Sequence, residues 1–143
     1  MHTRLVALVG VVLLVAGVSG VAALAAPADL PADDIVAGGM VILRPRVAAG
    51  GLTPLERSGI LYERLNQIIT DQSVRAADVR AVQSGGDWTV MAGRYLFVTA
   101  SAQDAAANRT TPKDLAQTWA ANLAKAIAAA RPIPPPRGGP YNQ

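Results

Sequence analysis

The chain of 143 residues contains no cysteine, and its one histidine is His2. These absences exclude several chemistries together. Without cysteine, disulfides and lipid-modified cysteines cannot form, and zinc sites built from thiolate and imidazole ligands are excluded. Nucleophile relays of the Ser-His-Asp and Cys-His types need an imidazole that only His2 could supply. We therefore expect a protein with no cofactor and no metal site, stabilised by packing alone.

Charged residues are also scarce, at 16% of the chain, and the net charge is only +3. The two signs alternate along the sequence, whereas nucleic-acid-binding proteins concentrate basic residues on one face. The carboxylates show no spacing typical of an acid–base pair. We expect no nucleic-acid partner and no enzymatic activity. A hydrolase that uses carboxylates alone is the remaining enzymatic alternative.

The N-terminus has the pattern of a secretory leader. Arg4 precedes an apolar run over residues 5–18, and Ala23-Leu24-Ala25 supplies the small residues of a cleavage site. We predict a signal peptide over residues 1–25 and a periplasmic or secreted location in a bacterial envelope. The alternative is an uncleaved anchor, because residues 5–26 carry no charge and are long enough to span a bilayer. Only in that case do we expect a membrane partner.

Three regions follow the leader. Residues 26–38 form a predicted linker, residues 39–131 a predicted α+β domain, and residues 132–143 a predicted proline-rich disordered tail. Two helices are expected in the domain, with Thr53 and Thr111 as N-caps, each followed by proline and, three residues after the cap, by an acidic residue. Arg57 is expected outside the apolar stripe of the first helix. Trp119 is expected in the core on the stripe of the second.

Alternating apolar residues predict four strands, over residues 40–46, 78–83, 88–92 and 95–100. Gly93-Arg94 separates the last two and is typical of a type II′ turn, which takes glycine first. The order β-α-β-β-β-α predicts a two-layer sandwich: a four-stranded, mostly antiparallel sheet with both helices on one face.

Several motifs resemble a known family. Residues 98–105 (VTASAQDA), Thr111-Pro112 and Trp119-Ala120, together with residues 52–57 (LTPLER) and 62–65 (YERL), resemble the small extracytoplasmic domain that precedes the pore in some bacterial small-conductance mechanosensitive channels. The resemblance covers about residues 40–129 and implies a stand-alone relative without a pore. It implies no catalytic or binding residue. Where relatives usually have glycine, this chain has Asn108, which is expected to accept a left-handed backbone.

Five residues are candidates for contact with a ligand or partner. Asp104, Asn108 and Thr110 lie in the predicted loop before the second helix, and Arg44 and Arg46 project from the same side of a strand. Three of them have a structural alternative: Asp104 caps a tight turn, and the two arginines form a solvated strand edge.

These observations predict a non-enzymatic envelope accessory that binds an unknown envelope protein or a small ligand. The alternative is a membrane-anchored extracytoplasmic regulatory subunit of a channel or transporter.

Overall fold

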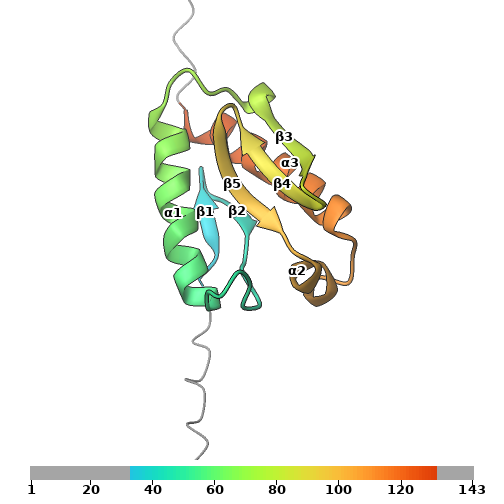
Figure 1. The fold of residues 1–143 in the computed structure, drawn as a ribbon. Coiled ribbons are helices and arrows are strands. Elements are labelled where there is room, and N and C mark those ends of the chain that lie inside the picture. Colours follow the sequence, from blue (N-terminus) through green and yellow to red (C-terminus); the bar gives the residue numbers. More distant parts are fainter. Residues whose placement is uncertain (1–32, 132–143) are drawn as a thin grey trace, which may run out of the picture.

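Strand pairing divides the domain into two antiparallel sheets (Figure 1). The computed structural model describes residues 33–131, so the predicted leader and the proline-rich tail lie outside the described residues. In chain order the elements are β1 (Ile35–Ala37), β2 (Met40–Leu43), α1 (Pro54–Thr70), the 3₁₀ turn η1 (Ala76–Asp78), β3 (Val79–Ser84), β4 (Asp87–Ala92), β5 (Tyr95–Ala100), α2 (Ala102–Ala107) and α3 (Pro112–Ala130).

The smaller sheet contains β1 and β2 only. Strand β1 lies in the segment assigned to a linker, and Ile35 within it is fully buried. The two strands are joined by Gly38-Gly39, which both have positive φ, the conformation that tight hairpin turns require. Because β2 pairs with this preceding strand and not with the other three, the predicted four-stranded sheet is not confirmed. The coarser α+β class is confirmed.

The larger sheet has the order β3-β4-β5, and its strands lie within one residue of the predicted positions. Gly93 has a φ of 58° and Arg94 does not have a positive φ, as the predicted type II′ turn requires. The register shifts between Val90 and Met91, where a bulge lengthens β5 relative to β4.

Both predicted long helices are present with their predicted caps. Thr53 and Glu56 form a full capping box at α1, in which Glu56 accepts from the Thr53 N–H at 2.8 Å. At α3 the Thr111 hydroxyl oxygen accepts from the Asp114 N–H, but the Asp114 carboxylate bonds the Thr111 hydroxyl and not its backbone N–H.

One segment was not expected to be helical. Residues 102–107 form the short helix α2, with Asn108 as its C-cap. The expectation of a left-handed Asn108 is wrong, because its φ is −99°. The left-handed residue is the next one, Arg109, with a φ of 54°.

One apolar core joins the two sheets. Helix α3 contacts all five strands and lies behind the larger sheet, whereas α1 lies at its side, beside β1 and β5 (Figure 1). Trp119 is 4% exposed, which confirms its predicted place in the core. The largest fully buried apolar side chains are Phe97, Ile35, Ile42, Ile68, Leu123, Ile127 and Val90.

Candidate functional site

Asp104, the first candidate, is a buried structural anchor. It is 1% exposed and lies in the first turn of α2, where its carboxylate accepts from the hydroxyl of Ser101 at 2.7 Å and the Ser101 oxygen accepts from the Asp104 N–H. The alternative reading of Asp104 as a cap therefore accounts for these contacts. Asp104 does not line either of the pockets described below.

The same carboxylate forms a buried ion pair with Arg57. Two nitrogens of the guanidinium donate to the two Asp104 oxygens at 2.9 and 2.8 Å, and one of them also donates to the carbonyl of Val47 at 2.6 Å. Arg57 is 8% exposed, so the expectation that it lies outside the buried stripe of α1 is wrong. Its spacing to Leu61 and Leu65, at steps of four residues, is the sequence signal that would have indicated its position on the buried row of α1.

The other four candidates meet at one pocket. This pocket, which we call the α3 pocket, has a volume of about 500 Å³. Arg44, Arg46, Asn108 and Thr110 all line it, although the arginines and the other two residues lie more than 60 positions apart in the sequence. Its remaining lining residues are Asp34, Val41, Ile42, Leu43, Leu115, Thr118, Trp119 and Asn122.

Local backbone geometry explains how the two arginines reach the α3 pocket. They follow β2, and Pro45 between them is fully buried, so the alternation of an extended chain leaves Arg44 and Arg46 both exposed. On the opposite wall, Asn108 closes α2 and donates its amide to the Asp104 carbonyl at 2.7 Å. Thr110 is exposed in the turn that leads to α3.

The electrostatics of the α3 pocket are unbalanced toward positive charge. Asp34 accepts two hydrogen bonds from Arg44, both at 2.6 Å, and these bonds, with the charges of Arg44 and Arg46, lower the pKa of Asp34. Arg46 forms no ion pair within residues 33–131. The pocket therefore holds two guanidinium groups against one carboxylate.

Apolar and amide groups complete the α3 pocket. Trp119 and Leu115 contribute buried side chains from α3, and Asn122 lies beside them and donates to the carbonyl of Ile42 at 3.1 Å. An apolar surface beside two arginines is suited to a ligand that has an anionic group and an apolar part.

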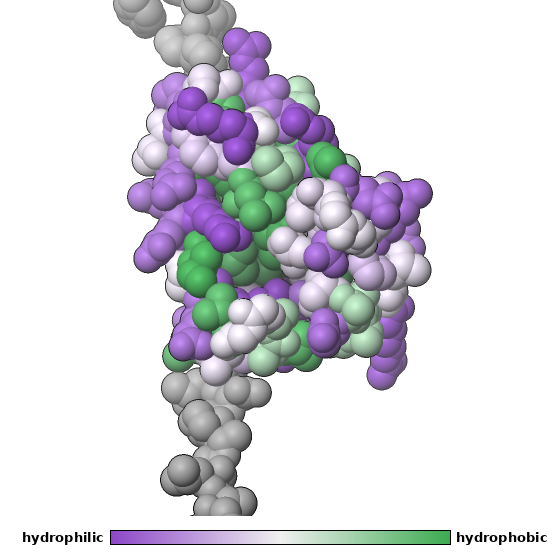
Figure 2. Space-filling view, in the orientation of Figure 1, coloured by the Kyte–Doolittle hydropathy of each residue, from purple (hydrophilic) through white to green (hydrophobic). Residues whose placement is uncertain are grey.

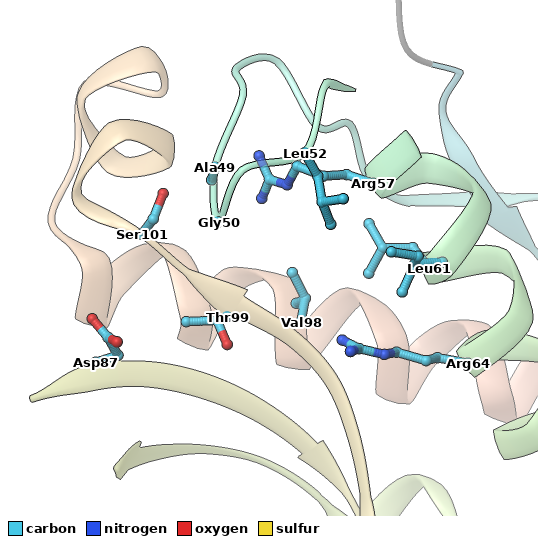
Figure 3. A pocket seen from close by; sticks show the side chains of 11 residues that line it. Ala49, Gly50, Leu52, Arg57, Leu61, Arg64, Asp87, Val98, Thr99 and Ser101 are labelled. Carbon is cyan, nitrogen blue, oxygen red and sulfur yellow. The ribbon is translucent and has the colours of Figure 1, made fainter. Parts of the chain in front are cut away.

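A second pocket of about 400 Å³ lies between α1 and β5 (Figure 3). We call it the α1–β5 groove. Arg64 from α1 reaches β5, where it donates to the Phe97 carbonyl at 3.0 Å. The groove contains none of the five candidate residues; it is lined by Ala49, Gly50, Leu52, Arg57, Ile60, Leu61, Arg64, Asp87, Val98, Thr99 and Ser101.

Within residues 33–131 no group of three or more acidic or histidine side chains is placed to hold a metal ion. In the same range no helix has the length and apolar character needed to cross a bilayer.

Comparison with known proteins gives one match. The family model of a domain of unknown function, DUF8459, matches residues 34–130. The chain belongs to this family. The match begins at Asp34, one residue before β1, so the family domain includes the hairpin that the sequence analysis assigned partly to a linker. No curated protein and no solved structure matches the chain.

Proposed function

We propose that this DUF8459 member is an exported, non-enzymatic module of the bacterial envelope that binds a small anionic ligand in the α3 pocket. The location rests on the leader pattern at residues 1–25. The binding site rests on one observation: four residues singled out separately in the sequence line a single pocket.

The chemistry of the α3 pocket favours a carboxylate or phosphate. A guanidinium presents several N–H donors in one plane and pairs with two oxygens of such a group. Arg46 has no ion-pair partner within residues 33–131, and Arg44 can exchange the partly exposed Asp34 carboxylate for the ligand. Thr110 adds a hydroxyl donor, and an apolar part of the ligand would lie along Val41, which is 52% exposed.

The lining also favours binding over hydrolysis. Each pocket contains one carboxylate, Asp34 in the α3 pocket and Asp87 in the α1–β5 groove. A hydrolase that uses carboxylates alone needs two that act as acid and base. Glu56, outside both pockets, is committed to the α1 cap, where hydrogen bonds from Thr53 lower its pKa.

Benzoate and acetate provide a direct test, because they have the same charge and differ in an apolar ring. We expect saturable NMR shifts of the Arg46 amide and the Trp119 indole, with benzoate bound about tenfold more tightly than acetate. Covering roughly 60 Å² of ring surface is worth about 1.5 kcal/mol, which is that factor.

Two charge reversals control for non-specific attraction. Arg46→Glu should abolish the benzoate shifts, whereas Arg80→Glu should preserve them, because Arg80 is exposed on β3 and lines neither pocket. Equal weakening by both variants, or no saturable shift in the unmodified protein, would refute the proposed site.

The second candidate is a membrane-anchored regulatory subunit of a channel or transporter, supported by the resemblance to the channel domain and the uncharged run at residues 5–26. Cell fractionation with intact-mass measurement separates the two. Export predicts a released protein that begins at Ala26, whereas anchoring predicts a membrane-bound protein that retains Met1.

A further inference from the structure

The buried ion pair of Arg57 and Asp104 lies outside the α3 pocket, yet it is bonded to two segments that line this pocket. One segment is the loop over residues 44–52, which carries both arginines of the pocket. The other is the turn over residues 108–111, which carries Asn108 and Thr110. Both segments lie between regular elements, so their positions depend on contacts from the elements around them.

Arg57 holds the loop from α1. Its guanidinium donates to the Val47 carbonyl at 2.6 Å, and Val47 directly follows Arg46. Among the described residues this is the only hydrogen bond from another element to residues 45–51. Figure 3 shows Arg57 directed from α1 toward this loop, with which it lines the α1–β5 groove. Loss of this donor would release the backbone next to Arg46.

Asp104 holds the turn from α2. Its carbonyl accepts from the Asn108 side-chain amide at 2.7 Å and from the Asn108 backbone N–H at 3.1 Å. Helix α2 has only six residues, too few to be stable through its own hydrogen bonds. The two bonds that Arg57 donates to the Asp104 carboxylate attach α2 to α1. The position of Asn108 therefore depends on the ion pair.

Burial makes this connection stiff. The side chain of Arg57 is 8% exposed and that of Asp104 is 1% exposed. Arg57 borders the α1–β5 groove, and Figure 2 shows apolar side chains gathered in the hollow between α1 and β5. Water competes weakly for charged hydrogen bonds in such surroundings, and the paired bonds of a guanidinium fix its orientation. One side chain thus holds the loop and α2 in a single arrangement.

We propose that Arg57 and Asp104 are positioning residues for the α3 pocket. The ion pair holds the loop of Arg46 and the turn of Asn108 at the separation that the ligand bridges, and neither member of the pair touches the ligand. This inference rests on the proposed binding of an anionic ligand in that pocket. Without the ion pair, both walls become ordered only when the ligand binds, and this entropic cost lowers the affinity.

Two substitutions break the connection in different ways. Asp104→Asn removes the negative charge that holds the guanidinium. Arg57→Lys keeps a positive charge beside Asp104, but one ammonium group cannot reproduce the paired bonds to the carboxylate together with the bond to Val47. In NMR titrations with benzoate, both variants should bind about tenfold more weakly than the unmodified protein, because two segments then lose freedom on binding. Arg57→Lys alone decides the test if Asp104→Asn does not fold.

Leu65→Ala controls for a general loss of stability. Leu65 is 3% exposed on the same row of α1 as Arg57, and it lines neither pocket. Truncation of a buried leucine destabilises a protein about as much as the loss of one partner of a buried ion pair. The Leu65→Ala variant should nevertheless bind benzoate with unchanged affinity.

The ligand-free protein provides a second readout. Both ion-pair variants should shift the NMR signals of the Val47 backbone amide and the Asn108 side-chain amide together, although these groups lie on opposite walls of the pocket. Leu65→Ala should leave both signals in place. A shift of the Asn108 signal alone would show that the pair does not hold the loop, and would overturn the proposal.

The remaining outcomes separate this inference from the proposed function. No saturable benzoate shift in the unmodified protein would refute the α3 pocket as a binding site, and the positioning role with it. Binding by the unmodified protein, with the same affinity in the folded ion-pair variants, would refute the positioning role alone. Equal weakening by Leu65→Ala would assign the effect to stability and would also overturn the role of the pair.

Discussion

The buried pair of Arg57 and Asp104 gives the sharpest prediction about stability. Asp104→Asn preserves the shape of the side chain and one oxygen for the Ser101 cap, so the main change is the loss of the negative charge. The Arg57 guanidinium is then left with no counter-charge at 8% exposure. Removing one partner of a buried pair typically costs about 3–5 kcal/mol, a large part of the roughly 5–15 kcal/mol that holds such a domain folded.

A matched control separates the charge from the cap. Asp114 occupies the same helical position in α3 that Asp104 occupies in α2, but it is exposed and forms no ion pair with a residue in the range 33–131. Asp114→Asn should therefore cost less than about 1 kcal/mol. Urea unfolding of both variants at neutral pH gives the comparison.

A double-mutant cycle then measures the coupling. Arg57→Met alone leaves Asp104 buried and unpaired, whereas Arg57→Met/Asp104→Asn removes both charges, so the double variant should be less destabilised than the sum of the single variants by about 2–4 kcal/mol. Added salt should change this coupling little, because the pair is buried. Additive costs, or an Asp104→Asn variant as stable as the parent, would refute the reasoning.

Two further predictions concern the turn at Gly38 and the carboxylate of Asp71. A Cβ at Gly38 would lie 2.8 Å from the Ala129 Cβ, whereas one at Gly39 meets nothing within 4 Å, and both residues have positive φ. Gly38→Ala should therefore lower the free energy of unfolding by about 2 kcal/mol more than Gly39→Ala. Equal losses in the two variants would contradict the close packing of this hairpin on α3. Hydrogen bonds from Ser73, then from Tyr95, lower the pKa of Asp71 to about 2. Because the folded-state pKa is depressed, the resulting stabilisation is present above about pH 4 and is lost as the pH falls toward 2. Asp71→Asn should therefore have a lower free energy of unfolding than the parent at pH 7 but not near pH 2 in urea titrations, and a difference independent of pH would count against this reasoning.

The helices could be predicted from the sequence because their signals are local. Thr53 and Thr111 each precede proline and supply the cap, and the apolar residues repeat with the helical period, so α1 and α3 begin where expected. The hairpin at Gly93 is local for the same reason, since a two-residue turn with glycine first allows few alternatives.

The division of the strands between two sheets could not be predicted from local signals. Residues 40–43 have the apolar character of a strand in either arrangement, and only the hydrogen-bonded neighbour distinguishes them. That neighbour is β1, whose three residues are too few to give a periodic pattern. Gly38-Gly39 was the one local signal for this hairpin, and it resembles a flexible linker as much as a turn.

The candidate site shows the same division. Residue type and spacing pointed to Arg44, Arg46, Asn108 and Thr110, but nothing in the sequence predicted that the two pairs face each other across α3. Asp104 was singled out by the same kind of signal, and its partner Arg57 lies 47 positions away, so the ion pair exists only because α1 and α2 meet.

The sequence alone therefore determined the caps, the lengths of the long helices, the hairpin of β4 and β5 and the buried place of Trp119, because each depends on groups a few residues apart. Tertiary structure decided which strands pair, which charges are buried together and which side chains share a pocket. Those outcomes depend on contacts between segments that are distant in the sequence. Such contacts stabilise the protein only after the entropic cost of bringing the segments together has been met, so no local pattern reports them.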